Sequence, residues 1–190
     1  MNDTTSHANA ATQEGWLTPY YYARAAFSIA WVGLAAAFGA GFPAIAAALL
    51  ILYPAWDALA NLADGRRSGG ILSNRPQAIN VLVSLVVTAA IAAALPDMHR
   101  VLAVIGAGAI LAGLRQLGAA LRRRKHSGAQ WAMILSGAQS ALAGAVFIHQ
   151  AGGPSAPSIA TVIGYAGFGA FYFLVSALAL SIKARRARRN

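Results

Sequence analysis

Six apolar runs, separated by short polar or turn-forming stretches, set the pattern of this chain. The runs cover about Tyr21–Ala40, Phe42–Leu62, Ala78–Leu95, Val101–Leu121, Ala129–His149 and Ser158–Ile182. A helix needs roughly 20 residues to cross a hydrocarbon layer about 30 Å thick, and each run meets or approaches that length. The pattern therefore predicts an all-α fold, an integral membrane bundle of six transmembrane helices.

Two prolines refine the second run. Pro43 follows a short Gly-containing turn and suits the first position of a helix, where its missing N–H costs nothing. Pro54 lies inside the run, but the stretch before it is too short to span a membrane. We therefore expect a helix that continues through Pro54 with a kink, and not one that ends there.

Composition supports the membrane class. The chain has 190 residues, of which 58% are hydrophobic and 11% are charged, against about 25% charged in soluble proteins. It has no cysteine, so it cannot form a disulfide or a thiolate metal site. The net charge is +10, but the basic residues stand at the ends of apolar runs. They therefore predict contact with anionic lipid headgroups and no nucleic-acid partner.

The distribution of Lys and Arg predicts the orientation. Of the 15 basic residues, 12 lie in the second and fourth connections and in the C-terminal tail, and one lies in the other three connections together. Basic residues stay on the cytoplasmic side, so both termini are expected in the cytoplasm. Residues 1–19 contain no Lys or Arg, which does not fit a secretory signal. We expect a polar tail there, disordered to about Glu14, and a basic tail over residues 184–190.

An internal repeat organises the membrane domain, residues 20–183. The segment Val104–Ile110 aligns with Val162–Phe168, 58 residues further on. The repeating unit is a helical hairpin, used three times over about 20–64, 78–121 and 129–182. Because two crossings return the chain to its starting side, these are parallel repeats, and they predict a pseudo-threefold bundle about the membrane normal.

The hairpins also carry a family pattern. The first hairpin has Tyr21-Tyr22, Arg24, Gly33 and Pro43, and the third has Trp131, Gly137, Gly144 and Pro154 followed by Ile163-Gly164. With these residues the chain resembles the HdeD-like acid-resistance membrane proteins over roughly residues 20–187. The resemblance implies a six-helix protein of a bacterial inner membrane that is linked to acid or stress resistance, and it supplies no catalytic residues.

Four polar residues inside the runs need an explanation: Arg24, Asp57, Arg115 and Gln139. The first three reach a similar depth, in the cytoplasmic third of the membrane. An unpaired charge near the bilayer centre costs about 2.5–3.5 kcal/mol, so we predict that Asp57 contacts Arg24 or Arg115; the alternative is that all three snorkel to the headgroups. A Gln near mid-membrane must hydrogen-bond, and Thr88 or Ser28 is the expected partner, with a water-filled cavity as the alternative.

Other candidate residues have more ordinary interpretations. Gly33, Gly108 and Gly144 begin or end pairs of small residues four apart, which favour close helix packing inside the bundle over a dimer interface. Asp57, Asn61 and Asp64 share one helical face, which we interpret as a solvated helix end and not a cation site. His99 and His149 flank the outer face, where they could sense external pH or be exposed without a role.

The sequence has no HExxH pair, no CxxC, no P-loop, no nucleotide-type Gly motif and no evident acid/base pair, so we expect no enzyme activity, no cofactor and no metal. The leading hypothesis is a non-enzymatic inner-membrane protein of the acid- or stress-resistance type. One alternative is a small channel or transporter with Arg24, Asp57, Arg115 and Gln139 along its path. Another is a membrane assembly subunit that binds a second copy or another membrane protein. A polar cavity would favour transport, and a dry centre packed with Ala and Gly would favour a structural role.

Overall fold

A computed structural model describes residues 2–123, 130–187 and 189, with side chains described for 15–121, 134–187 and 189. The described residues form six helices: α1 (Asn2–Phe38), α2 (Pro43–Arg67), α3 (Arg75–Ala94), α4 (Met98–Arg123), α5 (Gln130–Ala151) and α6 (Ala160–Ala187). The predicted all-α class is confirmed, and most helix ends lie within a few residues of those expected from the apolar runs.

The start of α1 differs from the sequence-based expectation. Residues 2–19 were expected to form a polar tail, disordered to about Glu14, but the structure has a helix from Asn2 that continues through Pro19. The segment is rich in Ala and carries Gln and Glu, which favour helix despite their polarity. Polarity therefore marked where the membrane run begins, and not where the helix begins.

Four helices are long and apolar enough to cross a membrane: α2, α3, α4 from Met98 to Leu121, and α6. Within the described residues, α1 and α5 do not meet the same measure. In α1, Arg24 and the neighbouring tyrosines lie within the apolar half of the helix and lower its mean hydropathy. The prediction that the chain has several helices of membrane-spanning length is thus confirmed. That all six helices span the membrane stays a prediction.

The ends of α2 and α3 follow from local sequence. Helix α2 begins at Pro43 and runs on through Pro54, as predicted from the two prolines. Its last turn leads into a loop in which Gly69 and Gly70 have φ of +91° and +96°, a backbone conformation that favours glycine. Asn74 then caps α3, where its side-chain oxygen accepts a hydrogen bond from the backbone N–H of Gln77 at 3.4 Å.

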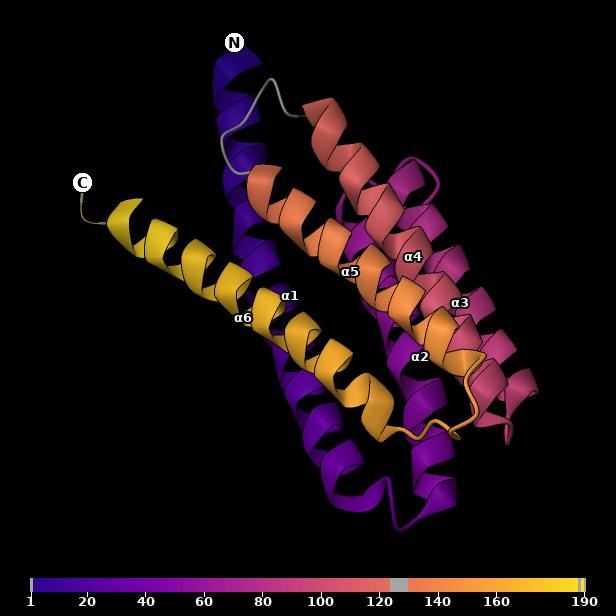
Figure 1. Cartoon of the computed structure of the whole chain (residues 1–190). Coiled ribbons are helices and arrows are strands. Elements are labelled where there is room, and N and C mark those ends of the chain that lie inside the picture. Colours follow the sequence, from indigo (N-terminus) through magenta and orange to yellow (C-terminus); the bar gives the residue numbers. More distant parts are fainter. Residues whose placement is uncertain (1, 124–129, 188, 190) are drawn as a thin grey trace.

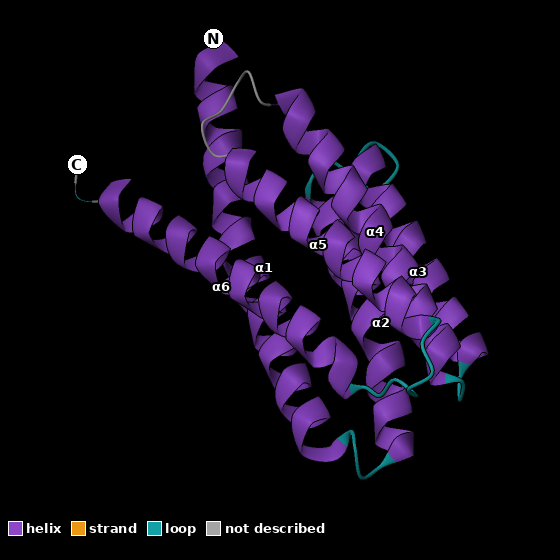
Figure 2. Ribbon diagram, in the orientation of Figure 1, coloured by secondary structure: helices purple, strands orange, loops and turns teal. Residues whose placement is uncertain are grey.

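The helices run between two ends of different character (Figures 1 and 2). At one, which we call the short-loop end, lie the connections 39–42, 95–97 and 152–159. At the other, the basic end, α2, α4 and α6 finish and α1, α3 and α5 begin. Basic residues of the described helices gather at the basic end, among them Arg66, Arg67, Arg75, Arg185 and Arg186.

The helices do not pack most closely within the predicted hairpins. The most extensive packing is of α4 on α5, followed by α1 on α6 and α2 on α3. Pairs joined at the short-loop end touch less, and α5 and α6 touch least among the contacting pairs. Close packing therefore joins one predicted hairpin to the next, and the hairpin repeat itself stays a prediction.

Glycines explain the close approach of α4 and α5. A Cβ added to Gly113 would lie 2.5 Å from the carbonyl oxygen of Gly137, and one added to Gly144 would lie 2.5 Å from that of Gly106. Such contacts are possible only without a side chain, so the predicted packing role holds for Gly144. Gly108 lies beside Val87 of α3, where a Cβ would be 3.2 Å from Cγ2. Gly33 does not follow the prediction, because a Cβ there would meet nothing within 4 Å.

The buried apolar core occupies the short-loop half of the bundle. Every helix contributes to it close to that end: Trp31, Ala35, Leu49, Leu50, Ile91, Val101, Leu102, Phe147, Ile159, Val162 and Ala166. Many other large apolar side chains face outward, for example Leu142 at 69% and Leu82 at 62% exposure. An apolar exterior of this kind suits lipid and not water.

Candidate functional site

A cavity of about 770 Å³ lies among the helices of the bundle. Arg24, Asp57, Arg115 and Gln139, predicted as polar residues within the membrane, all line it. They come from α1, α2, α4 and α5, while α3 and α6 complete the wall. Other polar residues along the wall are Tyr20, Tyr21, Tyr53, Asn61, Asp64, Gln77, Asn80, Ser84, Gln116, Ser136, Ser140, Tyr165 and Tyr172.

The cavity is polar toward one end and apolar toward the other. Along α3 it extends from Pro76, which is exposed near the basic end, to Ile91, a distance of about 22 Å at 1.5 Å per residue. Its apolar floor includes Ile91, Trp31, Leu50 and Val162, each at most 5% exposed. Apart from Ala166, the other residues of the buried core do not line the cavity, and the core closes the cavity toward the short-loop end.

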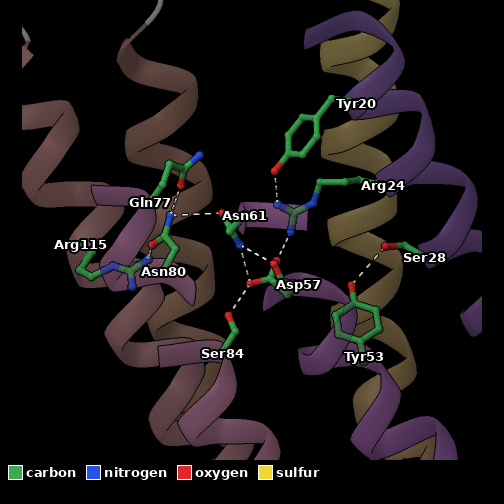
Figure 3. A network of polar contacts seen from close by, with 10 residues as sticks. All are labelled: Tyr20, Arg24, Ser28, Tyr53, Asp57, Asn61, Gln77, Asn80, Ser84 and Arg115. Atoms are coloured by element: carbon green, nitrogen blue, oxygen red, sulfur yellow. Dashed lines mark hydrogen bonds and ion pairs between the residues drawn. The ribbon is translucent and has the colours of Figure 1, made fainter. Parts of the chain in front are cut away.

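Arg24 and Asp57 form an ion pair between α1 and α2, as predicted for Asp57 (Figure 3). The Arg24 side chain is 13% exposed and donates one Nη to Asp57 Oδ1 and the other to the Tyr20 hydroxyl at 2.9 Å. Its guanidinium also lies 4.1 Å from the ring centroid of Phe173 on α6. The arginine thus joins three helices through a charge that is paired and covered by an aromatic ring.

The second oxygen of Asp57 is also occupied. Ser84 Oγ donates to Asp57 Oδ2 at 2.7 Å, and Asn61 Nδ2 donates to the same atom at 3.0 Å. A carboxylate that accepts several hydrogen bonds in addition to an ion pair is well compensated for leaving water. Asp57 therefore connects α1, α2 and α3 at a single point in the cavity wall.

Arg115 belongs to the same network without touching Asp57 through a described bond. Its Nη2 donates to Oδ1 of Asn80 on α3. Asn80 Nδ2 in turn donates to Gln77 Oε1 at 2.8 Å and reaches Asn61 Oδ1 at 3.4 Å (Figure 3). A chain of hydrogen bonds thus runs from Arg24 through Asp57, Asn61 and Asn80 to Arg115, across four helices.

The interpretation of Asn61 and Asp64 as a solvated helix end is wrong. These side chains are 5% and 7% exposed. Asp64 accepts a hydrogen bond from Gln77 Nε2 and another from Trp16 Nε1 at 3.3 Å. The adjoining part of α1, with Trp16, covers this turn of α2 and excludes the solvent that the sequence pattern led us to expect.

Gln139 hydrogen-bonds across the bundle, but not to the expected partners. It accepts a hydrogen bond from the Tyr172 hydroxyl of α6 at 2.8 Å. Thr88 instead donates to its own helix at Ser84 O, and Ser28 pairs with the Tyr53 hydroxyl at 3.3 Å. Depth in the membrane alone cannot identify a partner, because helix rotation decides which side chains face one another.

A second link between α5 and α6 lies one residue further along α5. Ser140 Oγ is 2.7 Å from the Tyr165 hydroxyl and 3.1 Å from the backbone oxygen of Ala109 on α4. Because helices α5 and α6 touch little, this link and the Tyr172–Gln139 bond are prominent among the contacts that hold them together.

The two histidines lie at the short-loop end and are not part of the cavity wall. His99 Nδ1 is 3.0 Å from the backbone oxygen of Ala151, so that nitrogen must carry the donated proton. His149 is exposed near the end of α5. Their pH-sensing role stays a prediction.

Sequence reasoning missed most of the polar contribution of α3. Gln77, Asn80 and Ser84 are three and four residues apart, which places them on one helical face. This polar face could have indicated a site. Uncharged polar residues are common near the start of a helix, however, where water can solvate them, so the face did not stand out. Within the described residues, no group of three His, Cys, Asp or Glu side chains is placed to hold a metal ion.

These features define the class as an all-helical protein with membrane-length apolar helices around a polar cavity. Compared with known proteins, the chain matches no family model, no curated protein and no solved structure. The resemblance to HdeD-like proteins thus stays a prediction.

Proposed function

We propose that this multi-pass membrane protein transports a small polar or charged solute, which enters the cavity from the basic end. The observation that carries the proposal is the convergence of Arg24, Asp57, Arg115 and Gln139, from four helices, on one space. A volume of about 770 Å³ falls in the range of small-molecule sites, about 300–1,000 Å³. Polar residues inside a membrane bundle are costly, and solute pathways are where they commonly occur.

The shape of the cavity favours a carrier over an open channel. A channel needs a continuous polar path, whereas the floor here is formed by Trp31, Leu50, Ile91 and Val162. The polar part reaches the basic end, which supports the proposal of a carrier that is accessible from one side. Transport then requires a second arrangement in which the floor opens and the basic end closes.

The pair formed by α1 and α6 is the part best placed to move. These helices pack closely on each other, but α6 touches α5 little and α1 touches α2 only moderately. Both connections from the pair to the other helices lie at the short-loop end, where a Cβ on Gly39 would lie 2.5 Å from Ile159 Cγ2. A rocking motion about this packed point would change the width of the cavity, with the Arg24–Asp57 pair as the contact to break.

The absence of cysteine makes a direct test simple, since every introduced thiol is unique. We would introduce Val83→Cys in the cavity wall and Ile105→Cys, which lines the cavity where it packs against the buried core, and reconstitute each variant in liposomes. A charged thiol reagent that does not cross lipid would then be added from one side at a time. Leu142→Cys, which points outward and is 69% exposed, serves as the lipid-facing control that should not react.

Transport predicts that Val83→Cys reacts rapidly from the basic side and that Ile105→Cys reacts from both sides, as the floor opens during the cycle. Reaction of both thiols from the basic side alone would describe a one-sided receptor and would contradict transport. Failure of Val83→Cys to react from either side would mean that solvent does not enter the cavity at all.

Other functional hypotheses remain as proposals. An acid- or stress-resistance role fits a carrier in the inner membrane. The proposed orientation, with both termini in the cytoplasm, rests on the gathering of Lys and Arg at the basic end. Lack of enzyme activity is likewise a prediction. Assembly with a second copy or another membrane protein draws support from the outward-facing Gly33, where a Cβ would find open space.

A further inference from the structure

We infer that the solute is an organic anion, held through its negative group by Arg115 and through its apolar body by the aromatic residues of α6. This inference rests on the proposed transport function and names the class of substrate. Three observations lead to it: hydrogen-bond donors without partners in the cavity wall, aromatic side chains that line the same cavity, and the positive charge of the end from which a solute would enter.

The carboxylates of the cavity are already occupied. Asp57 accepts from Arg24, Asn61 and Ser84, and Asp64 accepts from Trp16 and Gln77. A cationic solute would have to displace these donors before it could form an ion pair. The acidic groups in this wall therefore serve the structure and offer little to a cation.

The cavity wall instead contains hydrogen-bond donors that have no acceptor among the described residues. A guanidinium has five N–H donors, and among the described contacts Arg115 uses one, directed at the neutral oxygen of Asn80. Arg24 Nε also has no hydrogen-bond partner within the described residues, but it is buried and out of reach of a ligand. Arg115 lines the cavity and is half-buried, so its free donors are accessible to a ligand from within. A carboxylate or similar group, which accepts two parallel hydrogen bonds, matches this guanidinium.

An apolar body is required as well as a negative charge. Aromatic side chains of α6 line the same cavity, among them Tyr165, Phe168 and Tyr172. A small, strongly hydrated anion would lose its water there without full compensation, whereas an aromatic or aliphatic anion would bury apolar surface against the rings. The basic end, with Arg66, Arg67 and other cations, would raise the local concentration of any anion that approaches.

The test is the thermal unfolding of the purified protein in a neutral detergent at constant ionic strength. Three probes are compared: benzoate, benzyltrimethylammonium and inorganic phosphate. A ligand present at ten times its dissociation constant should raise the unfolding midpoint of a protein of this size by about 3–6 °C. Arg115→Gln removes the proposed partner, and Arg100→Gln, at an exposed position of the short-loop end, is the matched control.

We expect benzoate to raise the midpoint of the wild type and of Arg100→Gln but not of Arg115→Gln. An equal rise with inorganic phosphate would overturn the need for an apolar body, and a rise with benzyltrimethylammonium would overturn anion selectivity. A benzoate effect that persists in Arg115→Gln would remove Arg115 from the site. If no probe shifts the wild type while Ile105→Cys still reacts from both sides, transport stands and the anion inference falls.

A second measurement covers the case in which Arg115→Gln does not fold. Ala112 lines the cavity three residues before Arg115, on the same face of α4. In an otherwise wild-type chain, benzoate should slow the reaction of Ala112→Cys with the thiol reagent several-fold, and benzyltrimethylammonium should not. Equal reaction rates with and without benzoate would contradict the site.

Discussion

The Arg24–Asp57 ion pair can be tested by removing its partners singly and together. Asp57→Asn leaves the Arg24 guanidinium in place without its carboxylate, and Arg24→Met leaves the carboxylate without its cation. The double variant removes both charges. If the pair positions α1 against α2, the effects of the two substitutions must depend on each other.

The magnitude follows from burial. Losing one member of a buried pair costs about 3–5 kcal/mol, because the other charge is left unpaired. Arg24 is only 13% exposed, so we expect about 3 kcal/mol for Asp57→Asn. Asp57 is 32% exposed and keeps its bonds from Asn61 and Ser84, so Arg24→Met should cost about 2 kcal/mol. The double variant should cost about 2 kcal/mol, which gives a coupling energy of about 3 kcal/mol.

The assay is equilibrium unfolding in mixed detergent micelles, followed by circular dichroism, for the wild type and the three variants. The chain supplies a matched control in the Arg100–Asp97 pair, whose side chains are 78% and 43% exposed at a separation of 3.1 Å. The same cycle there should yield less than about 1 kcal/mol. Additive effects of Arg24→Met and Asp57→Asn would refute the reasoning and favour charges that snorkel independently to the headgroups.

Three further predictions address packing, the α5–α6 link and sidedness. Gly113→Ala should destabilise the protein by about 1–3 kcal/mol, because its methyl group meets the α5 backbone, while Gly33→Ala should be neutral or slightly stabilising in the same unfolding assay. Tyr172→Phe should cost about 1 kcal/mol through the lost bond to Gln139, against a few tenths for the exposed Tyr22→Phe; equal losses would contradict the link. Leu72→Cys, 93% exposed in the α2–α3 loop, should react with an impermeant reagent only in inverted vesicles, and reaction in intact cells would reverse the predicted orientation.

Helix positions could be predicted from the sequence far better than helix contacts. Apolar runs and prolines such as Pro43 place the helices, because insertion into lipid depends on composition and length. Contacts between helices depend on rotation and on shape, and helices that are apolar on several faces give little indication of either. Gly33 and Gly113 illustrate this, since both are glycines in apolar sequence, but only Gly113 lies against a neighbouring helix.

The sequence predicted those site residues whose burial in a membrane costs the most free energy. Arg24, Asp57 and Arg115 carry charges that apolar runs do not tolerate without a reason, and all three line the cavity. Asn80 and Gln77 carry no charge and were not predicted as site residues, although they connect Arg115 to the rest of the network. Charge gives a signal in the sequence, whereas the neutral residues that direct each charge become apparent only in the structure.

The short-loop half of the bundle contributes most of the buried apolar core, and the other half contains the polar part of the cavity. The apolar core at the short-loop end holds all six helices together, so the polar half does not have to be tightly packed. At the basic end the α1–α6 pair depends more on individual polar contacts, such as Arg24 with Asp57 and Tyr172 with Gln139. The residues that line the cavity are therefore also those that set its width. A solute that binds among them would compete with these contacts, which couples its binding to the movement that transport requires.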